Sequence, residues 1–280
     1  MIPAWLIYDE IGAARNRDYI ELHKKIGRQY DMDFSLRIVP NQSEIKTFLS
    51  ESGLPVFALV RTIRPELSGK LEECGVPVFN PSFVSRICND KGSTIAYIKE
   101  KTTVPTVPTK RFFHSQFSPE LLAEYPSHVI KSVCGHGGSQ VFLTDDNIEN
   151  IRAGLKKDDF VIQPWIKGRG KDVRVYVIGK KVIAAIERTS KDDFRANYSL
   201  GGTVRSIGLG DEILEFVHQI CEVFDFGLAG IDFLIDDRGN WLLNEIEDVV
   251  GARMLYQCQP DIHLLEQYFC YIHDKILQYR

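Results

Sequence analysis

Three carboxylates near the end of the chain have the spacing of a metal site. Asp232 interrupts an otherwise apolar run, 229–235, while Glu245 and Glu247 stand two residues apart in the next apolar run. If the two runs pair as a hairpin around a four-residue loop, 237–240, strand alternation puts both glutamates on one face, with Asp232 opposite Glu245. A solvent-facing surface with ordinary carboxylates is the alternative, and the apolar neighbours of Asp232 argue against it.

Carboxylates gathered in this way need a cation. Unpaired carboxylates that converge away from water repel one another and lose hydration, at a cost of several kcal/mol. Oxygen ligands without histidine or cysteine favour Mg²⁺ or Mn²⁺ over zinc. We therefore expect Asp232, Glu245 and Glu247 to bind magnesium or manganese.

A glycine-dense segment in the middle of the chain is a candidate for binding an anion. Lys131 is followed by Gly135, Gly137 and Gly138, and glycines let backbone N–H groups approach anionic oxygens while the lysine adds a charge. The spacing does not match the G-x-x-x-x-G-K-[ST] loop, and no G-x-G-x-x-G follows the first strand. Because glycine-rich hairpins are common, this segment alone is a weak indication of phosphate binding.

Cations gather in the stretch between the glycines and the acids. They are Lys167, Arg169, Lys171 and Arg174, then Arg188, Lys191 and Arg195. A solvated charged face is the simplest interpretation of such a cluster. Together with a metal site and a glycine loop, however, these cations favour a nucleoside triphosphate with its divalent ion.

The first part of the chain has the pattern of strands that alternate with helices. Apolar runs at 5–8, 33–39, 55–60 and 76–79 predict strands, and helical periodicity predicts helices between them. The expected helices are 18–30, one that runs from an N-cap at Ser43 to Leu49, and 66–74, which Gly75 ends. This order is typical of a parallel sheet flanked by helices.

The rest of the chain has a different pattern. After a helix at 90–100 and an extended stretch with two prolines, 103–108, short strand-like runs with glycine turns predict a mostly antiparallel α+β region. These runs are 129–133, 141–143, 160–163, 173–178 and 182–187. A helix at 212–224, the acidic hairpin and a last helix at 261–277, expected on the surface of the final lobe, complete the chain.

The composition of the chain limits the classes of protein to which it can belong. The 280 residues are 44% hydrophobic and 26% charged with a net charge of −4, which is ordinary for a globular chain of about two domains and gives no reason to expect nucleic acid or a membrane as partner. The longest apolar run, 54–60, is too short to span a bilayer, and the N-terminus has no signal-peptide pattern. Six scattered cysteines without a C-x-x-C pair indicate reduced thiols, so we expect a cytoplasmic protein.

Taken together, these motifs resemble the RimK-like carboxylate–amine ligases of the ATP-grasp superfamily. The resemblance runs from about Gly75 to Glu247 and is most specific over 184–202, followed by 229–232 and 244–247. It implies an α/β N-terminal lobe and an α+β ATP-grasp fold, in which two lobes with mostly antiparallel sheets clasp ATP. The implied divisions are an N-terminal domain at 1–88, a central lobe with the glycine-rich loop at 89–165, and a C-terminal lobe with the metal site at 166–280.

The resemblance also implies roles on the nucleotide side. Lys91 and Lys131 match the two nucleotide-binding lysines, 163–166 matches the strand that bonds adenine through its backbone, and Arg195 and Asn197 match the pair near the γ-phosphate and metal. The implied set for ATP is Lys91, Lys131, Gly137, Gly138, Ser139, Gln163, Trp165, Ile166, Asp172, Arg195 and Asn197, with Lys131 and Arg195 as catalytic residues. Asp232, Glu245 and Glu247 occupy the metal-ligand positions.

Two departures from the family pattern lie near the end of the acidic hairpin. The usual last metal ligand is asparagine, whereas this chain has Glu247, which keeps an oxygen ligand and adds a negative charge. The segment 248–253 replaces the Ser/Pro/Gly segment that borders the acceptor pocket, so the resemblance does not carry the identity of the substrate. Arg253 and Arg61 are candidates to hold a substrate carboxylate, with structural salt bridges as the alternative.

The activity that the resemblance implies is ATP-dependent ligation. A substrate carboxylate, of an amino acid or a peptide, attacks the γ-phosphate to give an acylphosphate and ADP, and an amine then displaces phosphate. A kinase on the same scaffold and a non-catalytic nucleotide-binding module are the alternatives. The acid, the amine, the number of additions and the oligomeric state, including a homo-oligomer, stay open.

Overall fold

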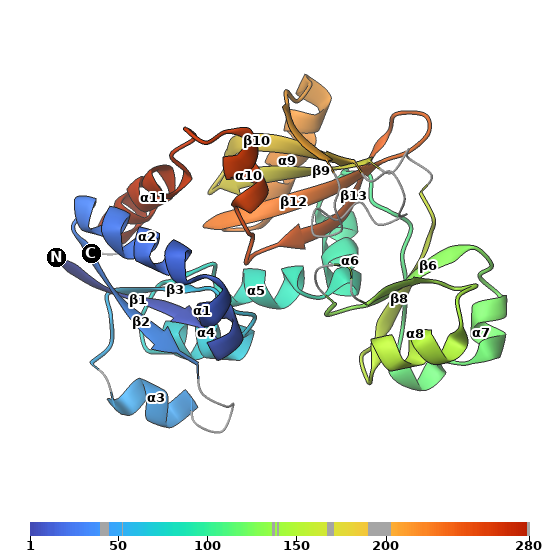
Figure 1. Ribbon diagram of the computed structural model, residues 1–280, viewed down its shortest axis with the longest axis horizontal. Helices are drawn as coiled ribbons and strands as arrows, with labels where there is room; N and C mark the ends of the chain where they lie inside the picture. Colours follow the sequence, from blue (N-terminus) through green and yellow to red (C-terminus); the bar gives the residue numbers. More distant parts are fainter. Residues whose placement is uncertain are drawn as a thin grey trace.

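In the computed structural model of the chain, the described residues are 1–39, 45–51, 53–135, 138, 140–166, 171–189 and 203–278. They form three sheets, which Figure 1 shows as an N-terminal domain, a large C-terminal sheet and a small lobe at the far end of the molecule. Among these residues no helix has the length and apolar character needed to cross a membrane. The expected combination of an α/β part with an α+β part is confirmed.

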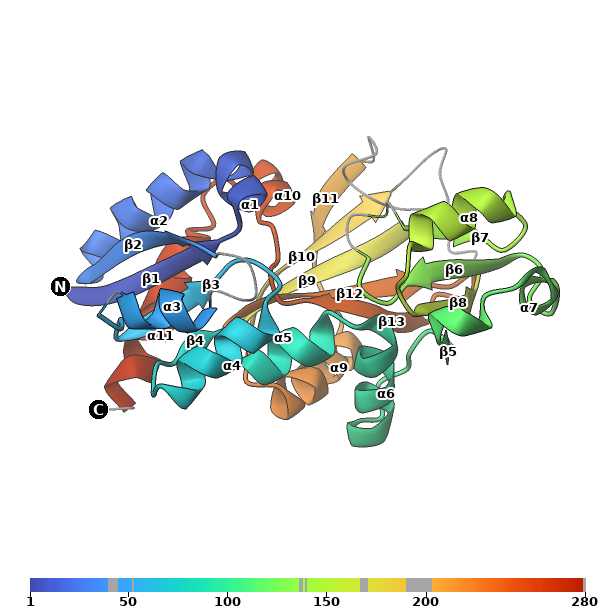
Figure 2. The ribbon, with the colours of Figure 1, turned by 90° about the horizontal axis from the view of Figure 1, so that it is seen from below.

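The N-terminal sheet is parallel, with the strand order β2-β1-β3-β4. Its central strand, β1, is buried from Ala4 to Tyr8, as a continuous apolar run requires when helices cover both faces of the sheet. Figure 2 shows α2 on one face and α4 on the other. The strands are β1 (Ile2–Tyr8), β2 (Met32–Ile38), β3 (Phe57–Val60) and β4 (Val78–Phe79), and the helices are α1 (Glu10–Arg15), α2 (Arg17–Gln29), α3 (Ile45–Glu51), α4 (Pro65–Glu73) and α5 (Ser82–Cys88).

The small lobe is antiparallel, with the strand order β5-β8-β6-β7, as the glycine turns predicted. Its own core forms around Ile130, Ile151 and Phe160. Helix α6 (Lys91–Lys101), capped by Asp90, precedes it. The other elements are β5 (Lys110–Phe112), the 3₁₀ turn His114–Gln116, α7 (Pro119–Ala123), β6 (His128–Ser132), β7 (Val141–Leu143), α8 (Ile148–Leu155) and β8 (Phe160–Pro164).

The C-terminal sheet is also antiparallel, with the order β11-β10-β9-β12-β13. Its strands are β9 (Lys171–Ile178), β10 (Lys181–Thr189), β11 (Thr203–Ile207), β12 (Leu228–Ile235) and β13 (Trp241–Glu247), and its helices are α9 (Asp211–Val223), α10 (Arg253–Cys258) and α11 (Leu264–Gln278). The expected last helix, 261–277, corresponds to α11, whereas α10 was not expected. One face of α11 is buried, and Cys270 and Leu277 on it are exposed. Phe269 of α11 belongs to one core with Phe34 of β2 and Tyr176 of β9, so this helix joins the N-terminal domain to the C-terminal sheet.

The acidic hairpin has a longer turn than expected and a β-bulge beside it, and these two differences offset each other in the strand register. The loop runs from Asp236 to Asn240, because Ile235 pairs with Trp241, and a β-bulge then follows between Asp232 and Phe233. The bulge leaves Asn244 as the extra residue and restores the pairing of Asp232 with Glu245. The expected register at the acids is therefore correct, although the four-residue loop from which it was inferred is wrong.

A buried histidine in this shared core gives the fold a pH dependence. His23 on α2 is 1% exposed, packs edge-on against Phe269 and has Nδ1 2.6 Å from the carbonyl oxygen of Tyr19. Burial lowers the pKa of His23 to about 3, well below the value of about 6.5 in an unfolded chain. Between these values only the unfolded chain binds the proton, so stability falls as pH falls, by about 1.4 kcal/mol per pH unit.

We expect His23→Gln to remove this component of acid sensitivity. The free energy of unfolding in urea, measured from pH 7 down to about pH 4, should fall less steeply for the variant than for the wild type. His218→Gln, at a largely exposed position on α9, is the matched control and should keep the wild-type slope. Equal slopes for His23→Gln and the wild type would contradict the assignment.

Candidate active site

The acidic residues of the hairpin meet where β12 and β13 run side by side. Asp232 pairs with Glu245 across the two strands, and one oxygen from each of Asp232, Glu245 and Glu247 lies within 4.8 Å of the others. Opposite ligands of one Mg²⁺ ion, with bonds of about 2.0–2.1 Å, stand about 4.0–4.2 Å apart, so a small movement of these side chains would bring their oxygens onto one ion. The donor set, all oxygen and with Asp232 only 1% exposed, therefore fits a divalent ion of the magnesium type.

Two arginines that were expected to bind phosphate instead contact these acids. Arg174 on β9 donates from Nε and Nη2 to the two oxygens of Asp232, at 2.7 and 2.6 Å, and its Nη2 is 2.7 Å from Glu247. Arg188 on β10 donates from Nη2 to Asp232 at 2.7 Å and forms a two-point pair with Asp172. The positive charge that the acid cluster requires is thus supplied in part by the protein itself.

The arginines keep Asp232 ionised in a buried position. Although burial favours the neutral acid, the guanidinium groups of Arg174 and Arg188 lower the pKa of Asp232 to about 2. Burial raises the pKa of Glu247, and Arg174 opposes that shift. A carboxylate has about four acceptor positions, and Asp232 uses three of them on the arginines, so it retains one for a further cation.

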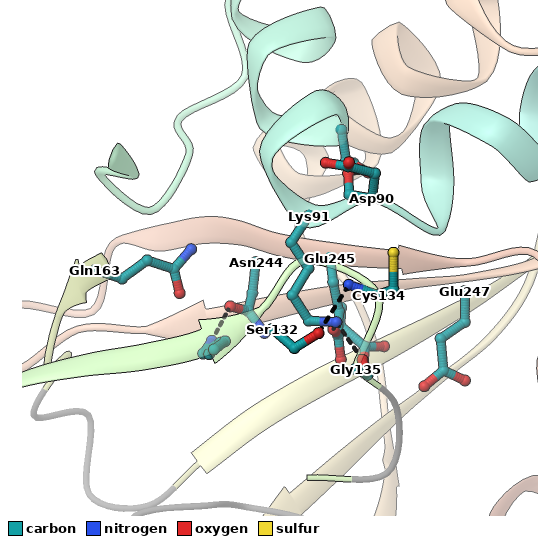
Figure 3. Close-up of polar contacts among 12 residues, drawn as sticks. Asp90, Lys91, Ser132, Cys134, Gly135, Gln163, Asn244, Glu245 and Glu247 are labelled. Atoms are coloured by element: carbon teal, nitrogen blue, oxygen red, sulfur yellow. Dashed lines mark hydrogen bonds and ion pairs between the residues drawn. The ribbon is translucent and has the colours of Figure 1, made fainter. Parts of the chain in front are cut away.

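Two lysines lie near the acids, Lys91 at the start of α6 and Lys131 on the small lobe; Figure 3 shows Lys91 extending from its helix toward Glu245. Lys91, the first residue of α6, donates to the carbonyl oxygen of Gly135 and lies 3.4 Å from Glu245. Lys131 on β6 donates to Asn244 at 3.0 Å. Burial lowers the pKa of Lys131 to about 8, against the opposing effect of Glu245.

Charges around the hairpin balance. The acidic members are Asp172, Asp232, Glu245 and Glu247, and the basic members are Lys91, Lys131, Arg174 and Arg188. Because the side chains nearly cancel one another, the site can accept a triphosphate and its divalent ions together, since these also bring little net charge. Asn244, which belongs to the matching stretch 244–247 but had no expected role, is the bulge residue and accepts a hydrogen bond from Lys131, so it also belongs to the site.

The other residues expected to bind the nucleotide are partly described. Gln163, next to the last residue of β8, is buried and donates from Nε2 to Thr109 at 2.8 Å; Figure 3 places it beyond Asn244. Trp165 is 38% exposed, Ile166 is half-buried and Gly138 has a φ of +76°. Asp172 is buried against Arg188 rather than open to a ligand. The expected residues Gly137, Ser139, Arg195 and Asn197, and the cations Lys167, Arg169 and Lys191, lie outside the described residues.

The segment that follows Glu247 is held in place by the N-terminal part of the chain. Asn80 donates to the carbonyl oxygen of Asp248 at 2.7 Å, and Asn89 donates to its carboxylate at 2.8 Å. Arg61 donates from Nη2 to the carbonyl oxygen of Val250 at 2.8 Å. These contacts fix the course of the chain at the metal-ligand position, and none of them was visible in the sequence because they join residues far apart along it.

A cavity of about 500 Å³ opens beside the acids and contains both arginines proposed for substrate binding. Its charged lining is Arg15, Asp18, Arg61, Arg174, Arg188, Glu247 and Arg253. Arg61 is half-buried; burial opposes its charge, whereas nearby tyrosines, Tyr8 first, raise its pKa, and Arg61 in turn opposes the rise that burial causes in the pKa of Asp248. Arg253 is exposed, and its Nη2 is 3.4 Å from Asn16 Oδ1. Among the described residues, neither arginine forms the structural salt bridge that was the alternative to substrate binding. The cavity is suited to an anionic ligand.

Comparisons with known proteins agree with this geometry. Residues 109–266 match the RimK-like ATP-grasp domain. An uncharacterised protein of Mycoplasma pneumoniae, the MG011 homologue, is 31% identical over 67% of this chain and 64% of its own length. A probable alpha-L-glutamate ligase of Haemophilus ducreyi is 29% identical over 59% of this chain and 56% of its own length. This chain therefore matches less than two thirds of the length of these curated relatives.

A solved structure shows the same arrangement of elements at low sequence identity. The D-alanine–D-alanine ligase of Bacillus anthracis, solved with ATP, superposes with a TM-score of 0.71, at 15% identity, over 99% of this chain and 98% of that one. At this identity the similarity concerns the fold alone.

Proposed function

Because the chain belongs to the RimK-like ATP-grasp family, we propose that it is an ATP-dependent ligase that joins a carboxylate to an amine through an acylphosphate. The observation that carries the proposal is the meeting of Asp232, Glu245 and Glu247 with two lysines, Lys91 at the start of α6 and Lys131 on the small lobe. This is the combination that phosphoryl transfer needs, because charge develops on the transferring group and has to be neutralised.

The roles of the side chains follow from their charges. Asp232, Glu245 and Glu247 would hold divalent ions, which neutralise the phosphate oxygens when bound. Lys91 and Lys131 bind the phosphates of ATP, and Arg195 and Asn197 remain proposals for the γ-phosphate. The substrate carboxylate attacks the γ-phosphorus, ADP leaves, and an amine then attacks the acylphosphate carbon and releases phosphate. The two lobes keep water away from the acylphosphate, which it would hydrolyse.

The cavity beside the acids, which we call the Arg253 cavity, is the proposed site of the acid substrate. It contains Glu247 at one end and is lined by Arg253, Arg61 and Arg15, which can hold a carboxylate. Amino acids or peptides are the proposed substrates, since the Haemophilus relative is a probable alpha-L-glutamate ligase and the Bacillus structure is a ligase of D-alanine. Six free thiols fit action in the cytoplasm, and the divisions after residues 88 and 165 are the proposed domain limits.

We expect ADP release to depend on a pair of substrates. The experiment measures ADP and phosphate with ATP, Mg²⁺ and a panel of amino acids and short peptides, offered singly and in pairs, with mass spectrometry of the products. A ligase turns over only with an acid and an amine together and yields an amide. A kinase would turn over with one compound and leave phosphate on the product, and turnover with no member of the panel would count against both.

A further inference from the structure

Helix α6 carries Lys91 to the acids, and its first turn is held against the loop that follows β6. The backbone N–H of Lys91 donates to the carbonyl oxygen of Val133 at 3.1 Å, and its Nζ donates to the carbonyl oxygen of Gly135 in the same loop. Figure 3 shows Lys91 beside Asp90 at the start of the helix, with its side chain extending toward Glu245. The position of the Lys91 ammonium group therefore depends on the contact between α6 and the small lobe.

One arginine of the small lobe lies across this contact. Arg111 on β5 donates from Nη1 to Asp90 Oδ1 and to Ser93 Oγ, both at 3.2 Å, and its Nη2 is 3.0 Å from Asp90 Oδ2. The same Nη2 donates at 3.3 Å to Oδ2 of Asp159, the residue directly before β8. A single guanidinium group thus joins the N-cap of α6 to the small lobe.

The same two segments are also connected through the backbone, by way of Val133. Its carbonyl oxygen accepts from the N–H of Lys91, and its own N–H donates to the carbonyl oxygen of Asp159 at 3.0 Å. The contacts of Arg111 therefore complete a ring, which holds the start of α6, the end of β6 and the start of β8 together. This ring lies directly beside the loop that contains Gly135, whose carbonyl oxygen binds the Lys91 ammonium group.

The aliphatic part of Arg111 is fitted to the helix. Gly92 is the second residue of α6, and a Cβ at this position would lie 3.0 Å from Arg111 Cδ and 3.4 Å from Arg111 Cγ. An ordinary surface pair involves one acid and a freely moving side chain, and it contributes little. Here one nitrogen contacts both Asp90 and Asp159, so removing the arginine leaves two like charges close together, and their repulsion acts to separate α6 from the small lobe.

We infer that Arg111 is a positioning residue for Lys91, the lysine proposed to bind phosphate. This inference rests on the nucleotide binding that the proposed function includes. Arg111 acts on the nucleotide through the position of Lys91 rather than by contact, since its charge is used on Asp90 and Asp159. Without the arginine, the ammonium group is no longer held in place before ATP binds, so part of the binding energy has to order it.

The experiment compares Arg111→Met and Arg111→Lys with Lys110→Met as control. Lys110 is the neighbouring cation on β5, and its ammonium group lies over the ring of Tyr125 and contacts the hydroxyl group of that residue. The rise in melting temperature of the full chain with the concentration of Mg·ADP gives Kd without turnover. Arg111→Met should raise Kd about 10-fold, Arg111→Lys should recover part of this loss, and Lys110→Met should leave Kd unchanged.

A double-mutant cycle with Lys91→Met separates positioning from a general structural role. Lys91→Met removes the ammonium group and keeps the backbone ring, so Arg111→Met should weaken Mg·ADP binding by less than about 2-fold in that background. Additive losses in the double variant, or wild-type affinity in Arg111→Met, would overturn the inference. ADP release that needs no pair of substrates, with the cycle as expected, would instead count against the ligase function and leave the role of Arg111 standing.

Discussion

Replacement of Glu245 by glutamine should abolish ATP turnover and leave the protein folded. Glu245 lies in the acid cluster, and its ion pair among the described residues is with Lys91 at 3.4 Å; after the change Lys91 keeps its hydrogen bond to the carbonyl oxygen of Gly135. An amide cannot supply the charge that holds a divalent ion against phosphate, and the loss should be about 10³-fold in kcat/KM. ADP release at saturating Mg²⁺, with the melting temperature of the variant, provides the measurement.

Glu247→Asn is the matched control, because asparagine is the residue that the family usually has at this position. The change keeps an oxygen ligand and removes the pair with Arg174 at 2.7 Å. Turnover should persist, at a higher Mg²⁺ requirement because one negative charge is lost. If Glu245→Gln kept wild-type turnover in the presence of Mg²⁺, and EDTA did not inhibit the wild type, the acid cluster would not be the metal site.

Local patterns in the sequence predict the parts of the site that lie on one hairpin. The alternation of Asp232, Glu245 and Glu247 with apolar residues placed the acids on one face, because strand period and hairpin pairing are local properties. The loop length was wrong, and the register survived because the bulge at Asn244 added the missing residue. A bulge has no strong signal in a sequence, so the hydrogen bond from Lys131 to Asn244 could not be foreseen.

Contacts between elements far apart in the chain could not be predicted in the same way. Arg174 and Arg188 were grouped as phosphate-binding cations, yet β9 pairs with β12 so that Arg174 stands opposite Asp232. The sequence contained both charges, and only the order of strands in the sheet showed that they face each other. Helix α11 is a similar case, since its burial depends on the packing of the N-terminal sheet against the C-terminal one.

This pairing of charges makes Asp232 the residue whose loss should most destabilise the fold. Asp232→Asn leaves the buried guanidinium groups of Arg174 and Arg188 short of a carboxylate that accepts three of their hydrogen bonds. Removing one partner of a buried ion pair costs about 3–5 kcal/mol, because the remaining charge stays buried and uncompensated. The free energy of unfolding in urea should fall by that amount, in the absence of ATP and added metal.

The pKa of Asp232 supplies an independent check on the same energy. The arginines lower it to about 2 from about 3.9 in an unfolded chain, so the carboxylate stabilises the fold above about pH 4 and this contribution is lost as pH falls toward 2. Asp232→Asn should be destabilised at pH 7 and should lose less stability than the wild type on acidification. Asp237→Asn, at an exposed position in the turn of the same hairpin, is the control and should fold like the wild type. A small effect of Asp232→Asn at pH 7 would mean that the arginines find other partners, and the balance of charges around the acids would then not hold the C-terminal sheet together.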